Sequence, residues 1–273
     1  MNKFTGIRGR VWFKALTGQA SSMPGDPRSV LTADAPIGED KARFLCVVPD
    51  PDGRFLCARR GEVGLEEAYT LAARVREAID ADKESAKRPI IAIVDVKCQA
   101  YGRREVTAGI YLAAAAAADA YASARFAGHP VIALIVGHAI SGGFLTHGYQ
   151  ANRLLAFDDD GVLIHAMHKE AAARVTRRTV AQLEKLAETV TPLSYNVRDY
   201  AKLGLLYRLL HVSDPEHPAP EDVSLVRQEV IAAIQDARKT SPDLINRIES
   251  EAARVARKAT RLVRARLEEQ WNQ

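Results

Sequence analysis

Three neighbouring small residues could stabilise a developing negative charge. Ser141, Gly142 and Gly143 follow an apolar run, residues 130–137, that is typical of a strand buried on both faces of a sheet. Gly142 and Gly143 lack a Cβ atom, so a substrate can approach their backbone closely, and Ser141 can cap the helix predicted over residues 142–150. The first N–H groups of that helix would point outward with the positive end of its dipole behind them. The segment therefore predicts an oxyanion site with Gly142 and Gly143 as backbone donors.

A second glycine turn follows the other strongly apolar run, residues 90–96. Gly102 and Arg103 open a helix there, and their backbone N–H groups could form a second anion-binding nest beside Tyr101. The alternative interpretation is a solvated, charged helix start, because Arg104 and Glu105 come next.

Ser141 also fits the relaxed pattern of a nucleophile elbow, small-x-Ser-x-Gly, over residues 139–143. In that motif the serine lies between a strand and a helix, as Ser141 is predicted to do. A serine hydrolase is therefore a rival hypothesis, although no partner is fixed by spacing. Asp158, Asp159 or Asp160 with His165, His168, His211 or His217 could complete a triad. The role of a helix cap beside an oxyanion site is favoured for Ser141, and His138 and His147 are interpreted as packing or supporting residues of this turn.

Composition limits the other classes of function. The net charge of +4 arises from 38 basic and 34 acidic residues, and only 6% of residues are aromatic, so nucleic acid is not an expected partner. Cys46, Cys57 and Cys98 lack zinc-site spacing, and no histidine pair has a further ligand at metal spacing, so no metal is expected. The sequence shows neither a signal peptide nor an apolar stretch long enough to cross a bilayer, which predicts a cytoplasmic protein.

The elements that must position these residues alternate along the chain. Residues 1–43 are rich in Gly and Pro and are expected to be mostly irregular, and residues 44–48 and 54–58 flank a turn and are expected to form a hairpin. Strands are predicted at 90–96, 130–137, 153–157, 162–166 and 205–212, and helices at 64–84, about twenty residues around the alanines 113–118, 168–178, 180–190, 221–239 and 242–271. This order predicts an α/β fold with a largely parallel sheet, in which ligands collect at the carboxyl ends of the strands.

Two segments carry a family resemblance. IVDVKCQAYGRREVTAGIYLAAAAAADAYA, from Ile93, and PVIALIVGHAISGGFLTHGYQANRLLAF, from Pro130, resemble the gamma subunits of biotin-independent malonate decarboxylases, which belong to the carboxyltransferase branch of the crotonase-like superfamily. VLIHAMHKEAAARVT, from Val162, is also similar to that family. Lys97 and Cys98 depart from the pattern, because related carboxyltransferases commonly have Pro-Gly there.

The resemblance implies a crotonase-like (ClpP/crotonase) ββα spiral fold with mostly parallel sheets. The likeness covers roughly residues 44–212. The expected organisation is an irregular N-terminal segment at residues 1–43, a crotonase-like carboxyltransferase domain at 44–240, and a C-terminal basic helix at 241–273. The five basic residues of that helix are either a solvated face or a surface for an acidic carrier protein or a phosphate-bearing arm: Arg254, Arg257, Lys258, Arg261 and Arg264.

The same resemblance implies a subunit that is active only with a beta subunit. Together they would decarboxylate a malonyl thioester, carried on the phosphoribosyl-dephospho-CoA group of an acyl carrier protein, to the acetyl thioester and CO2. Neither biotin nor a metal would take part. Gly142, Gly143, Gly102 and Arg103 would donate backbone hydrogen bonds, and Ser141, Tyr101 and His138 would contribute to binding. One half of a biotin-dependent acyl-CoA carboxyltransferase is the nearest alternative.

Overall fold

Two buried parallel strands form the centre of the fold. The computed structural model describes residues 5–272. In it β3 (Ile90–Val96) pairs in parallel with β4 (Val131–Ile140), and every residue of β3 is buried. A strand with a core on both faces needs mostly apolar side chains, which explains why Asp95 is its only residue other than Ile, Val and Ala. The register between the two strands shifts between Val94 and Val96, just before their ends.

Five further strands complete one seven-stranded sheet. The order across it is β1, β2, β3, β4, β5, β7, with β6 also paired to β4, and every pair except β1 with β2 is parallel. This confirms the predicted α/β fold with a mostly parallel sheet. The additional strands are β1 (Val30–Ile37), β2 (Asp40–Val47), β5 (Arg153–Phe157), β6 (Leu163–His165) and β7 (Arg208–Leu210).

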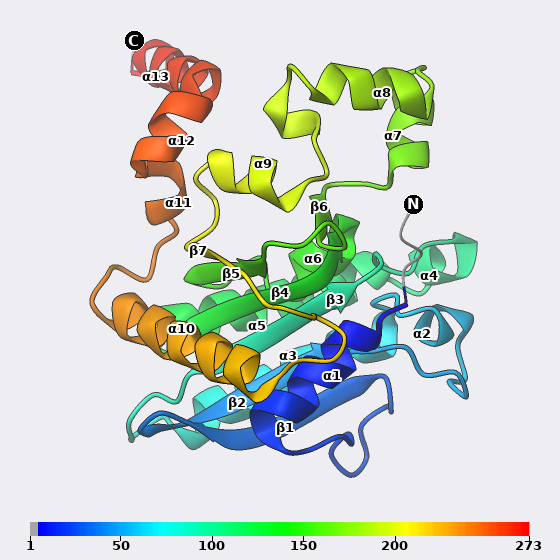
Figure 1. Cartoon of the computed structure of the whole chain (residues 1–273), viewed down its shortest axis with the longest axis vertical. Coiled ribbons are helices and arrows are strands. Elements are labelled where there is room, and N and C mark those ends of the chain that lie inside the picture. Colours follow the sequence, from blue (N-terminus) through cyan, green and yellow to red (C-terminus); the bar gives the residue numbers. More distant parts are fainter. Residues whose placement is uncertain (1–4, 273) are drawn as a thin grey trace.

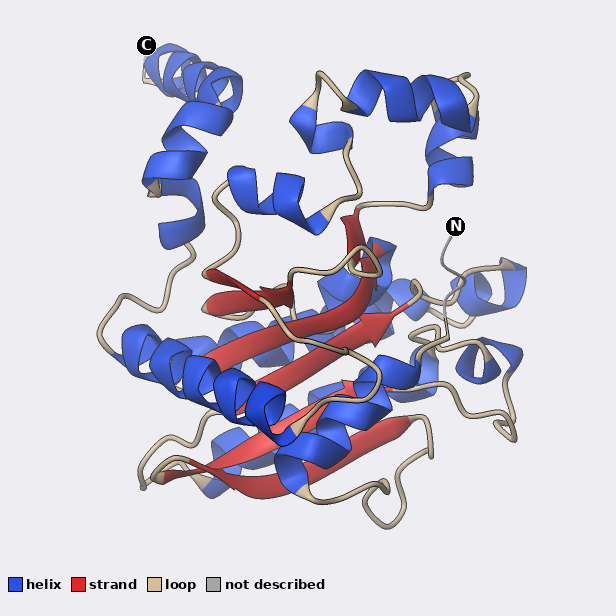
Figure 2. Ribbon diagram, viewed as in Figure 1, coloured by secondary structure: helices blue, strands red, loops and turns tan. Residues whose placement is uncertain are grey.

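Helices cover both faces of the sheet (Figure 1, Figure 2). α1 (Ile7–Thr17) and α10 (Pro220–Arg238) lie on the face turned toward the viewer, and α3 (Leu65–Ala81) and α5 (Ile110–Phe126) lie behind it. α3 and α5 pack against each other through a face of α5 that is mostly alanine. The predicted helices around residues 64–84 and 113–118 are therefore confirmed, as is the one near 221–239.

Two helical segments project above the sheet in the view of Figure 1. One follows β6 and contains α7 (Lys169–Val175), α8 (Val180–Ala187), the 3-10 helix η1 (Thr191–Leu193) and α9 (Val197–Lys202). The other closes the chain with α11 (Asn246–Glu249), α12 (Glu251–Ala256) and α13 (Lys258–Trp271). Short helices α2 (Leu56–Arg59), α4 (Arg103–Thr107) and α6 (Ser141–Thr146) lie in the loops at the carboxyl side of the sheet.

The expectation that residues 1–43 are mostly irregular is wrong for the described part, residues 5–43. Gly6 and Gly18, each at positive φ, bound helix α1, whose Trp12 and Phe13 are fully buried. Gly38 makes the tight turn between β1 and β2 at φ +60. Three of the glycines that suggested irregular chain therefore bound regular elements, and this segment contributes to the main hydrophobic core.

Three other predictions are corrected. Residues 44–48 do form a strand, but its hairpin partner is β1, because residues 54–58 enter helix α2 instead. The last strand is only Arg208–Leu210, and α9 before it was not predicted. The single helix expected at 242–271 begins at Asn246 and breaks twice, at Ser250, which is extended at ψ 152, and at Arg257, with φ −110 and ψ 28. Within residues 5–272 no helix is both long and apolar enough to span a membrane.

Candidate functional site

The carboxyl ends of three parallel strands open into one cavity. Lys97 follows β3, Ser141 follows β4, and His168 lies three residues after β6. The cavity has a volume of about 730 Å³. This placement agrees with the general position of ligand sites in parallel sheets. Its lining comprises Arg60, Glu62, Lys97, Cys98, Gln99, Tyr101, Ser141, Met167, His168, Glu170, Ala171 and Arg174.

Ser141 is held in a conformation that L-residues rarely adopt. Its φ is +60, and it is one of only two non-glycine residues at positive φ within residues 5–272. Such a residue costs about 1–3 kcal/mol and tends to occur at functional sites. Its hydroxyl caps no helix: α6 begins at Ser141 itself, after Ile140 as N-cap, without a side-chain cap bond. The predicted cap role is therefore wrong, and the side chain is presented to the cavity.

α6 is shorter than the predicted helix over residues 142–150. It ends at Thr146 because His147 leaves the helical conformation, with φ −125 and ψ 99. The His147 ring is fully buried and makes two hydrogen bonds, to the Tyr121 hydroxyl at 2.9 Å and to the Ile93 carbonyl oxygen at 2.9 Å. A carbonyl oxygen only accepts, so Nε2–H donates to Ile93 and Nδ1 accepts from Tyr121. The supporting role predicted for His147 is confirmed.

Gly142 accommodates a side chain of the same protein. Its N–H donates to Oε1 of Gln99 at 2.8 Å, and a Cβ on Gly142 would lie 2.8 Å from Gln99 Cδ. In this structure the expected oxyanion donor is thus engaged by Gln99. The missing Cβ makes room for that amide.

Gly143 makes room for the backbone of the loop that follows β3. A Cβ there would lie 2.6 Å from the carbonyl carbon and 2.7 Å from the carbonyl oxygen of Cys98. That backbone is also fixed from the other side, because the Val63 N–H donates to Cys98 O at 2.9 Å and the Ala100 N–H donates to Val63 O at 2.8 Å. The two glycines therefore allow the loop after β3 to lie directly on α6.

The second glycine turn faces a carboxylate of its own. Gly102 is the N-cap of α4, and Glu105 Oε2 lies 2.6 Å from the position of a Cβ on Gly102. Arg103 is exposed on that helix, whereas Tyr101 lines the cavity and is 62% exposed. Of the residues predicted from sequence, Tyr101, Ser141 and the candidate triad residue His168 line the cavity, and α6 carries Gly142 and Gly143 beside it.

The cavity holds more positive than negative side chains. Arg60 pairs with the buried Glu62 at 2.8 Å, but Lys97 Nζ lies 3.9 Å from the same carboxylate, beyond hydrogen-bonding distance. Arg174 and Glu170 come from α7. The set of three cations and two carboxylates suits a ligand with a negative charge.

The neutral groups in the cavity wall and directly behind it differ in reactivity. Burial, and then the Glu62 charge, raises the pKa of the Cys98 thiol to about 12, so Cys98 is not a thiolate nucleophile at neutral pH. Burial lowers the pKa of His168, and burial followed by the nearby His168 lowers that of His138 to about 4. Both imidazoles are therefore neutral at pH 7. Among the described residues, no group of three or more His, Cys, Asp or Glu side chains could hold a metal ion.

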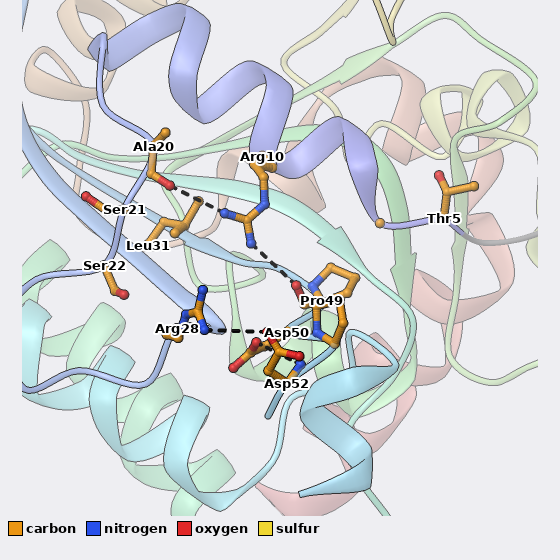
Figure 3. Close-up of a pocket in the computed structure, with 12 residues that line it drawn as sticks. Thr5, Arg10, Ala20, Ser21, Ser22, Arg28, Leu31, Pro49, Asp50 and Asp52 are labelled. Carbon is orange, nitrogen blue, oxygen red and sulfur yellow. Dashed lines mark hydrogen bonds and ion pairs between the residues drawn. The ribbon is translucent and has the colours of Figure 1, made fainter. Parts of the chain in front are cut away.

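A second cavity lies away from these strand ends (Figure 3). It has a volume of about 420 Å³ beside the first turn of α1. Its arginines bind the chain itself: Arg10 donates to the carbonyl oxygens of Ala20 and Pro49, each at 3.4 Å, and Arg28 lies 3.6 Å from Asp52. These contacts tie the segment after α1 to the loop after β2, so we assign this cavity a structural role.

Sequence reasoning missed several residues that line the site, among them Gln99, Arg60, Glu62 and Arg174. Gln99 stands in a loop directly after a buried strand, which is a signal that could have found it. Nothing in the sequence marks Arg60 or Glu62. They lie beside the cavity because Val63, which follows them, pairs with Gln99 in a β-bridge.

Comparisons with known proteins agree on one family. The family model for the malonate decarboxylase gamma subunit matches residues 58–271. A Pseudomonas malonate decarboxylase has been solved as a hetero-tetramer in complex with coenzyme A and as an MdcD–MdcE hetero-dimer. The matching chain of the first is 50% identical, with a TM-score of 0.90 over 95% of this chain and 99% of that one. The second gives 51% identity and a TM-score of 0.87 over 97% and 99%.

More distant relatives extend the comparison. The malonyl-S-ACP:biotin-protein carboxyltransferase MADD of Malonomonas rubra is 40% identical over 165 residues, which are 59% of this chain. The chain spans 56% of the length of that relative. A transcarboxylase 12S structure shares the crotonase-like fold at 17% identity, with a TM-score of 0.63 over 88% of this chain and 43% of that one.

Proposed function

The chain belongs to the malonate decarboxylase gamma-subunit family, and from that premise we propose that it is one half of an enzyme that decarboxylates a malonyl thioester. The observation that carries the proposal is the cavity at the carboxyl ends of β3, β4 and β6, with the strained Ser141 in its wall. Its volume of about 730 Å³ lies in the range of small-molecule sites. Its excess of cations suits the malonyl carboxylate.

The proposed reaction needs charge stabilisation rather than a nucleophile. The bond between the α-carbon and the carboxylate breaks, CO2 leaves, and the electron pair forms a thioester enolate that is then protonated on carbon. Groups that stabilise the enolate more than the bound substrate accelerate this step, and one oxyanion donor typically contributes ~3 kcal/mol. By family position the beta subunit would hold the enolate, and this chain would hold the carboxyl group.

The backbone donors proposed for this chain are Gly142, Gly143, Gly102 and Arg103. Gln99 engages the first of them, and the turn at Gly102 faces Glu105. A substrate therefore reaches those two turns only after side chains move. Gly143 remains the proposed backbone donor in the first turn of α6. We place Ser141 and Tyr101 in contact with substrate and His138 behind the cavity wall, next to His168.

The proposed partners are a beta subunit and an acyl carrier protein. Tyr101 on the cavity rim and Val106, Tyr111 and Leu112 on α4 and α5 are all more than half exposed. An apolar surface of this kind next to a polar cavity suits a subunit that closes the active site. The thioester would be carried on the phosphoribosyl-dephospho-CoA group of the carrier, in the cytoplasm, and without biotin or a metal.

The test is co-purification of the tagged full-length chain with its partners, followed by measurement of CO2 release from malonate. We expect a homologous subunit and a small carrier protein to co-purify, with release that persists after addition of avidin. Inhibition by avidin would instead indicate a biotin-dependent carboxyltransferase, the activity named for the Malonomonas rubra relative. Absence of CO2 release from the complete complex would contradict the proposal.

One observation favours a second candidate, a serine hydrolase. A serine at φ +60 between a strand and a helix has the geometry of a nucleophile elbow, and His168 lines the same cavity. The His147 and His165 rings, however, are bonded elsewhere, to Tyr121 and Ile93 and to Met167, whereas the base of a triad would bond to Ser141 Oγ. Hydrolysis of simple esters that is lost in Ser141→Ala, with an acyl-serine trapped in the unaltered chain, would support this candidate.

A further inference from the structure

The side chain of Gln99 is fixed at the position where the sequence led us to expect substrate. Its Oε1 accepts the Gly142 N–H at 2.8 Å, which is a normal hydrogen bond. Because a backbone N–H can only donate, this contact decides which end of the amide faces α6. The other end, the Nε2–H2 group, must point away from Gly142.

Nε2 carries two hydrogen-bond donors. No residue of the described chain, 5–272, accepts a hydrogen bond from it. Gln99 is half-buried and lines the cavity of about 730 Å³ together with Ser141 and Lys97. Since Oε1 is turned to the helix, the amide presents its N–H groups to the cavity.

The backbone under this amide is held on both sides. Val63 pairs with Gln99 in a parallel β-bridge, with hydrogen bonds on either side of it to Cys98 and Ala100. Gly143 lies against the Cys98 carbonyl group on the other side. A donor fixed before the ligand arrives needs no reorganisation, which is the property of an effective binding group in an active site.

We propose that Gln99 is the residue of this chain that hydrogen-bonds the carboxylate of the substrate, through Nε2, while Gly142 holds its Oε1. The proposal rests on the malonyl-thioester decarboxylase function and adds a specificity determinant to it. An acetyl thioester has no group for this donor, so Gln99 would discriminate substrate from product.

The neutral character of the amide fits the reaction. A cation bonded directly to the carboxylate would stabilise the charge that must leave that group, and so would favour bound substrate over the transition state. Lys97 and Arg60 line the same cavity, but both lie beside Glu62. A neutral donor orients the carboxylate and stabilises its charge less, so it favours the bound substrate over the transition state less than a cation would.

The test replaces the donor and keeps the shape. In Gln99→Glu, one carboxylate oxygen can still accept the Gly142 N–H, and the other replaces the NH2 group. In the assembled complex we expect KM for the malonyl thioester to rise roughly 10- to 100-fold, which corresponds to the loss of a hydrogen bond to a charged group. Binding of acetyl-CoA, measured by calorimetry, should change less than about threefold, since it does not use this donor.

Gln182→Glu is the matched control. Gln182 closes the capping box of α8 through Oε1, a contact that Glu also makes, and it is exposed. We expect KM and the preference for malonyl-CoA over acetyl-CoA to stay unchanged in it. Gln99→Met, which removes the donor without adding charge, should also lose the preference, and thermal melting and co-purification of the partner check that each variant folds and assembles.

Two results would overturn the proposal. One is an unchanged preference for malonyl-CoA over acetyl-CoA in Gln99→Glu. The other is a higher turnover in Gln99→Met, which would mean that Gln99 blocks the Gly142 N–H rather than serving the substrate. Absence of CO2 release in the unaltered complex would instead refute the decarboxylase function, so the two failures are distinguishable.

Discussion

Alanine at Gly142 and alanine at Gly143 should have different consequences, although the two glycines are adjacent. At Gly142 the new Cβ meets the end of a flexible side chain, Gln99, at 2.8 Å. At Gly143 it meets the carbonyl carbon of Cys98 at 2.6 Å, and that backbone is held by the hydrogen bond from Val63. A side chain can rotate away, whereas the Cys98 backbone can move only by breaking that bond.

The expected magnitudes follow from this difference. Overpacking typically costs 1–3 kcal/mol, and alanine is favoured over glycine within a helix by about 1 kcal/mol. For Gly142→Ala these effects nearly offset each other, so we expect the free energy of unfolding to change by less than about 1 kcal/mol. The rate of CO2 release at substrate concentrations below KM should still fall roughly 10- to 100-fold, because the amide of Gln99 is displaced from the cavity and its hydrogen bond to the carboxylate is lost.

For Gly143→Ala we expect the free energy of unfolding to fall by at least about 2 kcal/mol, because the backbone must move. Denaturant unfolding of the isolated chain measures stability, and CO2 release by the assembled complex measures turnover. A normal rate of CO2 release below KM in Gly142→Ala would show that the position of Gln99 is irrelevant to the reaction. A Gly143→Ala chain as stable as the unaltered one would contradict the packing argument.

Three further predictions concern other parts of the molecule. Ser141→Ala should keep turnover within about tenfold, since no nucleophile is needed; complete loss in the folded complex would favour the hydrolase. Burial lowers the pKa of His147 to about 4, below the value near 6.5 of an unfolded chain, so its contribution to stability is present above pH 6.5 and is lost as the pH falls toward 4. We expect the free energy of unfolding to fall less between pH 7 and pH 5 in His147→Gln than in the unaltered chain. An equal fall in both chains, measured by urea unfolding at each pH, would refute this. Arg247 is 96% buried and donates to the carbonyl oxygens of Tyr149 and Ala151, so Arg247→Met should destabilise the chain by roughly 3 kcal/mol, and an unchanged melting temperature would show that the C-terminal helices are an independent extension.

The sequence predicted best the elements whose environment is uniform. Residues 90–96 lie in the middle of the sheet, so their apolar run alone identifies β3 with its correct bounds. Residues 5–43 were misjudged because Gly and Pro have the same local preference in a loop and at the end of an element. Burial of Trp12 and Phe13 and the pairing of β1 with β2 make that segment regular, and such contacts are not visible in local sequence.

At the site too, the contacts between distant parts of the chain could not be predicted from local sequence. The glycine pair after β4 was correctly recognised as a close approach, but the approaching group was taken to be substrate. In the structure it is the loop of Cys98 and Gln99, more than forty residues earlier in the chain. Which group fills the space above a glycine is a tertiary property, since it depends on the pairing of β3 with β4.

This arrangement gives the two glycines and the strained serine one common explanation. The loop after β3 can lie on α6 only where Cβ atoms are absent, and that contact places the Gln99 amide beside Ser141. Ser141 must then turn the chain from β4 into α6 within a single residue, which requires its positive φ. The positive φ of Ser141 costs about 1–3 kcal/mol. The strain persists because β4 before the turn is almost entirely buried and cannot shift to relieve it. A rigid sheet centre thus fixes a strained turn, and the turn and the glycines together set the positions of the polar groups that face the cavity.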